Sequence, residues 1–176
     1  MVFALLVWAV VIFNRLVRDR NRVKTAWSDI DVQLKRRHDL IPKLVAAVEQ
    51  YARYEQSTLR TLIEIRSRAV SVASVDEKSS LESHLGAGLL KLVALVEDYP
   101  ELKADESFLT LQKDMTDVEN HIQYARRFYN GAVRNLNTRI DSFPDLLIAR
   151  LLQFKPHTFF ELESPTESGT PEIFQS

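Results

Sequence analysis

The four histidines of this 176-residue chain are its best candidates for metal binding or proton transfer. They are His38, His84, His121 and His157, and none has Glu or Asp three residues before it. A di-iron helical bundle needs Glu-x-x-His pairs, in which both side chains project from one face of a helix. The sequence therefore predicts no metal centre, and we expect each histidine to lie on the surface or between helices.

Other catalytic groups are equally hard to find. The chain has no cysteine, which excludes disulfides, thiolate metal sites and a cysteine nucleophile. It contains no H-E-x-x-H, phosphate-binding loop, G-x-G-x-x-G or G-x-S-x-G motif. Asp29 and Asp31 are two residues apart, so they cannot share a helix face for acid–base work. We expect no enzymatic activity and no cofactor, and the net charge of only −1 argues against a nucleic-acid partner.

Two groups of basic residues could bind an acidic partner or anionic lipid headgroups. One follows an apolar stretch at residues 1–13, and the other is a run of three cations further along the chain. The candidate docking residues are Arg15, Arg18, Arg22, Lys35, Arg36 and Arg37. A solvated helix end is the alternative explanation of the second group, because cations are stabilising near the carboxyl terminus of a helix.

A polar seam is predicted on the last long helical stretch, at Arg126, Asn130 and Asn137. The two asparagines are seven residues apart, so they occupy equivalent heptad positions, the first of them beside Tyr129. Asparagine near a helix seam often specifies register and pairing at some cost in stability. We expect this structural role rather than a ligand pocket, and we expect Trp27 and Tyr129 to be core aromatic residues.

The elements that must position these residues are predicted to be helices. Only 4 Gly and 6 Pro occur, too few turns for a sandwich, a barrel or an alternating α/β fold. Apolar residues recur every three or four positions, which predicts helices at about 14–38, 40–70, 79–98 and 103–143 and a short one at 145–152. The third opens on Ser79-x-x-Glu82, which has the form of a capping box. The predicted fold is all-α: an elongated antiparallel four-helix bundle over 14–152, then a flexible acidic tail at 153–176.

Residues 1–13 contain no polar side chain and precede Asn14 and the first arginines. Thirteen helical residues span about 20 Å, whereas the hydrocarbon core of a bilayer is about 30 Å thick. We expect a partial transmembrane anchor whose remainder lies upstream of Met1. A secretory signal and a buried core segment are the alternatives. The positive charge after the stretch predicts a single-pass inner-membrane protein with its helical domain in the cytoplasm.

Three blocks of sequence carry a family resemblance. The first comprises 14–18, 20–23 and the contiguous stretch AWSDIDVQLKRRHDLIPKLV at 26–45. The second comprises YPELKA at 99–104, Phe108, Leu111-Gln112, Glu119, Ile122, Ala125-Arg126 and YNGAV at 129–133. The third comprises Asn137, Phe143-Pro144, Phe154 and Phe159-Phe160. On these blocks the chain resembles the LemA family of bacterial membrane-anchored helical proteins, although Leu136 stands where that family favours an aromatic residue.

The resemblance implies an amino-terminal membrane helix with its short end outside, a helical domain on the other face, and no enzymatic activity. We therefore predict a single-pass scaffold or adaptor for other envelope or membrane proteins, with homo-oligomerisation as a further option. A membrane-remodelling or anionic-lipid-binding factor is the alternative function. An enzyme with a site between the helices is the least favoured alternative.

Overall fold

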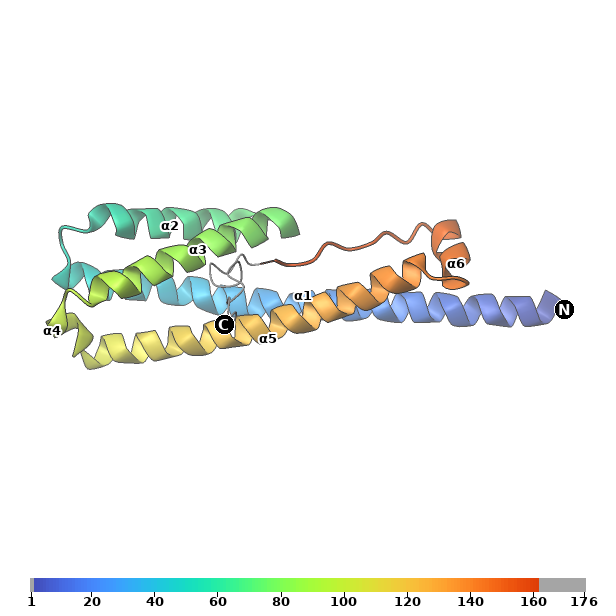
Figure 1. Ribbon diagram of the computed structural model, residues 1–176, viewed down its shortest axis with the longest axis horizontal. Coiled ribbons are helices and arrows are strands. Elements are labelled where there is room, and N and C mark those ends of the chain that lie inside the picture. Colours follow the sequence, from blue (N-terminus) through green and yellow to red (C-terminus); the bar gives the residue numbers. More distant parts are fainter. Residues whose placement is uncertain (1, 162–176) are drawn as a thin grey trace, which may run out of the picture. The chain divides into compact units, whose positions relative to one another are not determined.

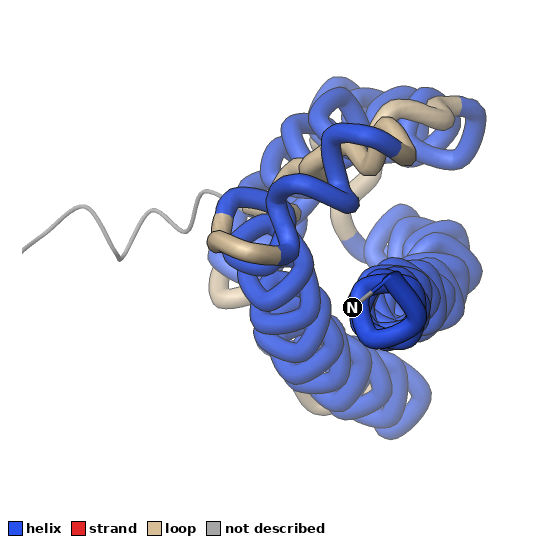
Figure 2. The backbone as a smooth tube through the Cα atoms, turned by 90° about the vertical axis from the view of Figure 1, so that its right-hand side faces the viewer, coloured by secondary structure: helices blue, strands red, loops and turns tan. Residues whose placement is uncertain are grey.

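The computed structural model describes residues 2–161, and its regular elements in that range are all helices (Figure 1). They are α1 (Val2–Tyr51), α2 (Gln56–Ser71), α3 (Val75–Val96), α4 (Pro100–Lys103), α5 (Glu106–Asp141) and α6 (Asp145–Leu151). Short loops join them, and the described part of the chain contains no strand (Figure 2). The all-α prediction is thereby confirmed for these residues.

The chain divides into two compact units, and α1 and α5 each contribute to both. Of the described residues, unit 1 comprises 2–37 and 115–160, and unit 2 comprises 38–114 and Glu161. Unit 1 therefore holds the first part of α1, the second part of α5, α6 and the segment after it. Unit 2 holds the end of α1, then α2, α3, α4 and the start of α5. This division does not confirm the expected four-helix bundle.

The predicted helix break near residue 39 is wrong, because α1 continues through Pro42. A proline inside a helix has no N–H to donate, so the carbonyl of His38, four residues earlier, loses its helical partner. In unit 2 the Nε of Arg66 donates a hydrogen bond to that carbonyl oxygen at 3.1 Å. A side chain from α2 thus satisfies the acceptor that the proline leaves open, and the helix can run on.

The predicted start of the third helix at Ser79 is also wrong. Helix α3 begins at Val75, and both Ser79 and Glu82 are buried inside it rather than capping its first turn. Acidic residues in the first turn, Asp76 and Glu77, favour the earlier start because the amino-terminal end of a helix attracts negative charge. The predicted helix at 40–70 is likewise interrupted, since residues 52–55 separate α1 from α2.

Helix α5 starts at Glu106, three residues later than predicted, because Asp105 caps it. The carboxylate Oδ1 of Asp105 accepts a hydrogen bond from the backbone N–H of Phe108 at 2.9 Å, as an N-cap residue does. The other oxygen, Oδ2, accepts one from the hydroxyl of Tyr51 at 3.3 Å. The negative charge of Asp105 raises the pKa of the Tyr51 phenol.

Helices α2 and α3 pack along each other in unit 2. Their buried faces carry mainly aliphatic side chains, including Leu59 and Leu62 on α2 and Leu85 on α3. Gly88 marks a close approach, because a Cβ built on it would lie 2.9 Å from the Cδ1 of Leu62. Glycine at this position therefore lets the two helices come together.

The apolar stretch at the amino terminus forms the start of α1 and remains exposed to solvent. The exposed large side chains are Phe3, Leu5, Leu6, Val7, Trp8, Val10, Val11 and Phe13. Within residues 2–161, no helix combines the length and the apolar character needed to cross a membrane.

The predicted flexible tail is wrong for residues 153–161. They follow α6 without helical structure, and side chains of α5 bind their backbone at His157, Thr158 and Phe160. The rest of the predicted tail, 162–176, lies outside the described residues.

Candidate functional site

Within unit 1, two asparagines on α5 hold the extended segment at residues 157–160 against that helix. Asn137 donates from Nδ2 to the carbonyl oxygen of His157 and accepts the N–H of the same residue at Oδ1, both at 2.9 Å. Asn130 makes the same pair of hydrogen bonds with Phe160, at 3.1 and 2.9 Å. We call Asn130 and Asn137 the amide clamp.

The spacing of the amide clamp matches the chain that it binds. Seven residues of α-helix rise about 10.5 Å, and three residues of extended chain cover about 10 Å. Asn137 pairs with residue 157 and Asn130 with residue 160, so helix and segment run antiparallel in register. The heptad spacing of the asparagines predicted pairing between two helices. In the structure these asparagines pair α5 with an extended segment instead. Arg126, one turn before Asn130, is half-buried on α5.

An aromatic cluster of Trp27, Tyr129 and Phe160 lies next to the amide clamp. The ring centroid of Trp27 is 5.3 Å from that of Tyr129 and 5.5 Å from that of Phe160. Tyr129 also donates its hydroxyl to the carbonyl oxygen of Thr158 at 2.9 Å. Both residues expected in the core therefore meet in one cluster, although Trp27 itself is half-buried. The clamp and the cluster thus bind the backbone of this segment and hold it along α5.

Arg139 ties α1, α5 and α6 together within unit 1. Its Nε lies 2.6 Å from Oδ2 of Asp19 on α1, and its Nη1 lies 3.0 Å from Oδ2 of Asp145 on α6. The hydrogen bond with Asp19, more than any other contact, raises the pKa of the Arg139 guanidinium. This cation between two carboxylates fixes the corner between α5 and α6.

The end of α6 turns back through a Schellman motif. Gln153 takes a left-handed backbone conformation, with φ of 54°. The N–H of Gln153 donates to the carbonyl of Arg150 at 3.2 Å, and that of Phe154 donates to Ala149 at 2.9 Å. The turn places the Phe154 ring 6.4 Å from that of Phe13 and 5.3 Å from the Arg20 guanidinium. The α6 corner is therefore a fixed part of unit 1.

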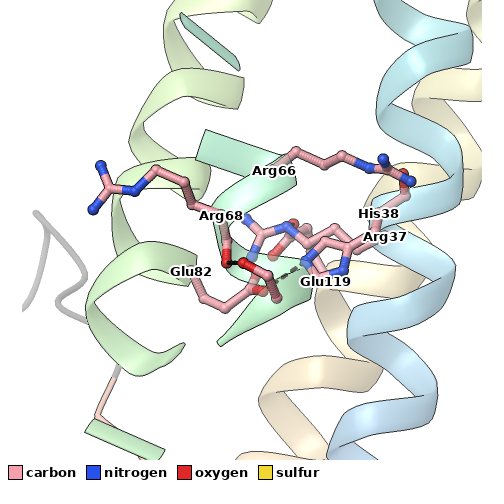
Figure 3. Close-up of polar contacts among 7 residues, drawn as sticks. Arg37, His38, Arg66, Arg68, Glu82 and Glu119 are labelled. Carbon is pink, nitrogen blue, oxygen red and sulfur yellow. Dashed lines mark hydrogen bonds and ion pairs between the residues drawn. The ribbon is translucent and has the colours of Figure 1, made fainter. Parts of the chain in front are cut away.

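Of the six candidate docking residues, five are exposed and one is not. The exposed ones are Arg15, Arg18, Arg22, Lys35 and Arg36. Arg37 is only 1% exposed, and its Nε lies 2.8 Å from Oε1 of Glu119 on α5 (Figure 3).

The prediction that Arg37 docks a partner is wrong, because a buried arginine cannot present its charge. Arg37 falls on the same helix line as the buried Ile30, Leu34 and Ile41, at spacings of four, three and four. This periodic signal was available in the sequence, but the neighbouring cations Lys35 and Arg36 obscured it.

A shallow groove of about 350 Å³ lies between α1 and α5 of unit 1. Its lining residues are Asp29, Val32, Gln33, His121, Tyr124, Ala125 and Phe128. Val32, Tyr124 and Phe128 are each more than half exposed. Aromatic and aliphatic side chains at such exposure are typical of protein interaction surfaces.

Residues 26–174 match the sequence profile of the LemA family. This chain belongs to the LemA family. It is 28% identical over 153 residues to protein LemA of Metamycoplasma hominis, an alignment that covers 84% of this chain and 68% of that protein. It is 24% identical to magnetosome protein MamQ 2 of Paramagnetospirillum magneticum, over 93% of this chain and 70% of the relative. Magnetosome protein MamQ of Magnetospirillum gryphiswaldense is 23% identical with the same coverage.

In unit 2 of this LemA-family chain, His38 and Glu82 form a buried pair that sequence reasoning missed. The Nε2 of His38 lies 2.7 Å from Oε1 of Glu82, and the side chain of Glu82 is fully buried (Figure 3). Glu82 stands on the line of Leu85, Leu89 and Leu92 on α3, so a carboxylate on an apolar stripe was the available signal. Two polar groups at this burial stabilise the fold only as partners of each other.

The remaining histidines lie apart from this pair. His84 and His121 are exposed, and His157 is half-buried, with its backbone bound by Asn137. Among the residues that the structure describes, no three His, Asp or Glu side chains gather as metal ligands would.

Proposed function

We propose that this LemA-family protein is a membrane-associated adaptor without catalytic activity, which presents helical surfaces to other membrane or envelope proteins. The observation that carries the proposal is the start of α1. There, eight large apolar side chains between Phe3 and Phe13 are exposed. Exposed apolar surface of this extent on one helix is unfavourable in water and is typical of a segment that enters lipid or a protein partner.

The charges that follow this stretch favour lipid. Arg15, Arg18 and Arg22 are exposed and spaced three and four residues apart, so they share one face of α1. Cations next to an apolar segment are attracted to anionic headgroups at the cytoplasmic face of a membrane. We therefore propose the inner membrane as the location, with the chain after this stretch on the cytoplasmic side.

The groove formed by Val32, Tyr124 and Phe128 supports the adaptor part of the proposal. It is a separate feature from the exposed start of α1, and it lies about 20 residues further along that helix. A helix or peptide with apolar anchors would bury these three side chains, and Asp29 and His121 at its edge would orient it.

Flotation of the whole chain with phosphatidylglycerol-containing vesicles tests membrane association. We expect the protein to float with the vesicles, and we expect a Phe3→Ser, Leu6→Ser, Val10→Ser variant to stay at the bottom of the gradient. Val32→Ser, another exposed apolar position on α1, is the matched control and should float normally. A native chain that remains at the bottom would refute membrane association.

Site-specific photo-crosslinking in cells tests the adaptor role. A photoreactive residue at Phe128 should give discrete crosslinks to one or a few proteins. The same residue at Asn135, exposed on the same helix, should not. Equal crosslinking at both positions would refute the groove as a partner site, and crosslinks to a second copy of the chain would show homo-oligomerisation instead.

Remodelling of anionic membranes is a second candidate function, favoured by the exposed arginine row on α1. Electron microscopy of vesicles distinguishes it from simple docking. A remodelling factor should change vesicle shape at high protein density, and an Arg15→Gln, Arg18→Gln, Arg22→Gln variant should lose that effect.

A further inference from the structure

Four large apolar side chains at the corner between α5 and α6 remain exposed. Phe143 is 79% exposed, Leu147 is 54%, Leu151 is 75% and Leu152 is 47%. The first three recur at intervals of four residues, and Leu147 and Leu151 lie on one face of α6. We call these four residues the corner patch.

The fold does not need the corner patch to hold α6 in place. Arg139 binds Asp145 at the start of the helix, Ala149 is its buried side chain, and the Schellman motif closes its end. The exposed leucines therefore extend from a fixed platform. Their exposure is a property of the folded unit, because the contacts that hold the helix are made by other residues.

The corner patch lies at the same end of unit 1 as the exposed start of α1. Phe154, two residues after Leu152, packs against Phe13 at the end of the apolar stretch. Figure 1 shows α6 beside the amino-terminal part of α1. Two exposed apolar surfaces from distant parts of the sequence thus lie next to each other.

Positive charge borders the corner patch. Arg150 lies within it along the chain and Lys155 follows it, and both are exposed, as are Arg15 and Arg18 on α1. Asp19 and Asp145 do not oppose these cations, since Arg139 already binds both carboxylates.

One exposed carboxylate, Asp141, lies at this corner and contributes the opposing charge. The exposed cations outnumber it. Apolar side chains with a cationic border match the boundary between acyl chains and anionic headgroups.

We propose that the corner patch inserts into the headgroup–acyl boundary of an anionic bilayer and forms a second membrane contact beside α1. This inference rests on the proposed membrane association. Two contacts from one compact unit orient that unit on the membrane, whereas a single helix leaves it free to rotate about its anchor. A second copy of the chain is the less favourable occupant, because a two-fold interface brings the same arginines of both copies together.

The chain has no cysteine, so a single introduced cysteine can carry an environment-sensitive dye at one chosen position. Leu151→Cys reports on the corner patch, Val7→Cys on the start of α1, and Asn135→Cys on exposed α5 as the control. With vesicles of phosphatidylcholine and phosphatidylglycerol, we expect blue-shifted emission and quenching by lipid-borne nitroxides at positions 151 and 7. Position 135 should stay aqueous.

The outcomes separate this inference from the proposed function. Insertion at position 7 without insertion at 151 overturns the corner contact and leaves membrane association intact. No insertion at either position overturns both. A blue shift at 151 that needs no vesicles and grows with protein concentration shows that a second copy covers the patch, which also overturns the inference.

A second measurement uses side chains that the fold does not need. Phe143→Ser, Leu147→Ser and Leu151→Ser together should weaken vesicle binding by roughly tenfold or more, because partly inserted apolar side chains each contribute to membrane affinity. Leu90→Ser, exposed on α3 in unit 2, is the control and should bind as the native chain does. Unchanged affinity of the triple variant, with its helix content retained, would refute the contact.

Discussion

The two units of this protein complete their cores with different secondary structure. In unit 2 the helical pair α2 and α3 packs over the core, and the backbone of each helix satisfies its own hydrogen bonds. In unit 1 an extended segment at 157–160 contributes instead, and it has no helical hydrogen bonds of its own. The side chains of the amide clamp instead form hydrogen bonds with its backbone at His157 and Phe160. An extended segment thus requires polar side chains at a set spacing, whereas a helix requires only an apolar stripe.

The polar side chains of the amide clamp and those around Pro42 differ in the same way. In unit 1 the clamp side chains bind backbone, and no charge is needed for that purpose. In unit 2 the buried side chain of His38 pairs with the side chain of Glu82. The backbone carbonyl of His38 accepts a hydrogen bond from Arg66, because Pro42 has no N–H to donate to it. The first arrangement recognises the shape of an extended chain, and the second compensates for an interruption in a helix.

The largest expected effect is on the aromatic cluster of unit 1. Trp27→Ala should lower the free energy of unfolding by about 3 kcal/mol, because the Trp27 ring packs against Tyr129 and Phe160. Urea unfolding followed by far-UV circular dichroism measures it. Trp8→Ala removes the other tryptophan, which is exposed on α1, and should change stability little. A loss below about 1 kcal/mol at Trp27 would show that the extended segment does not depend on this cluster.

The next effect tests the amide clamp directly. Asn137→Ala should cost about 2 kcal/mol, since it removes two hydrogen bonds to the half-buried backbone of His157. Hydrogen exchange of the His157 amide, followed by NMR, should accelerate. Asn135→Ala, on the exposed side of the same helix, is the matched control. An unchanged exchange rate at His157 would mean that the segment is held without the clamp.

A smaller effect tests the compensation in unit 2. Arg66→Met keeps the apolar stem and removes the donor to the His38 carbonyl, and it should cost about 1 kcal/mol. In a Pro42→Ala background the helix regains its own N–H, so the same change should cost less. Chemical denaturation of the native chain, the two single variants and the double variant gives the coupling. Equal losses in both backgrounds would show that Arg66 does not compensate for the proline.

The smallest effects compare two helical glycines, one from each unit. Gly131→Ala should raise stability by about 0.5–1 kcal/mol, because alanine favours the helix and no atom lies within 4 Å of the new Cβ. Gly88→Ala should gain less or lose stability, since its Cβ would meet Leu62 at 2.9 Å. Thermal unfolding of both variants measures the difference. A larger gain at Gly88 than at Gly131 would contradict close packing of α2 and α3.

Local periodicity was enough to predict that the described chain is helical and where its second long helix lies. Apolar residues at spacings of three and four predicted α5 over 103–143, and the helix runs over Glu106–Asp141. The family resemblance also followed from contiguous motifs, of which the stretch at 26–45 is the longest. These features depend on neighbours within one or two turns, so the sequence alone contains them.

Only the tertiary structure decided where the polar residues would find their partners. The Arg66 donor that lets α1 pass Pro42 is 28 residues from the carbonyl it serves, and Glu82 is 44 residues from His38. Asn137 binds backbone 20 residues away, and Arg37 becomes buried against Glu119 on another helix. Hydrogen bonds and ion pairs act over a few ångströms in space and carry no periodic trace along the chain. Local patterns therefore predicted helical structure. The packing of distant segments determined which charges were buried and which remained exposed.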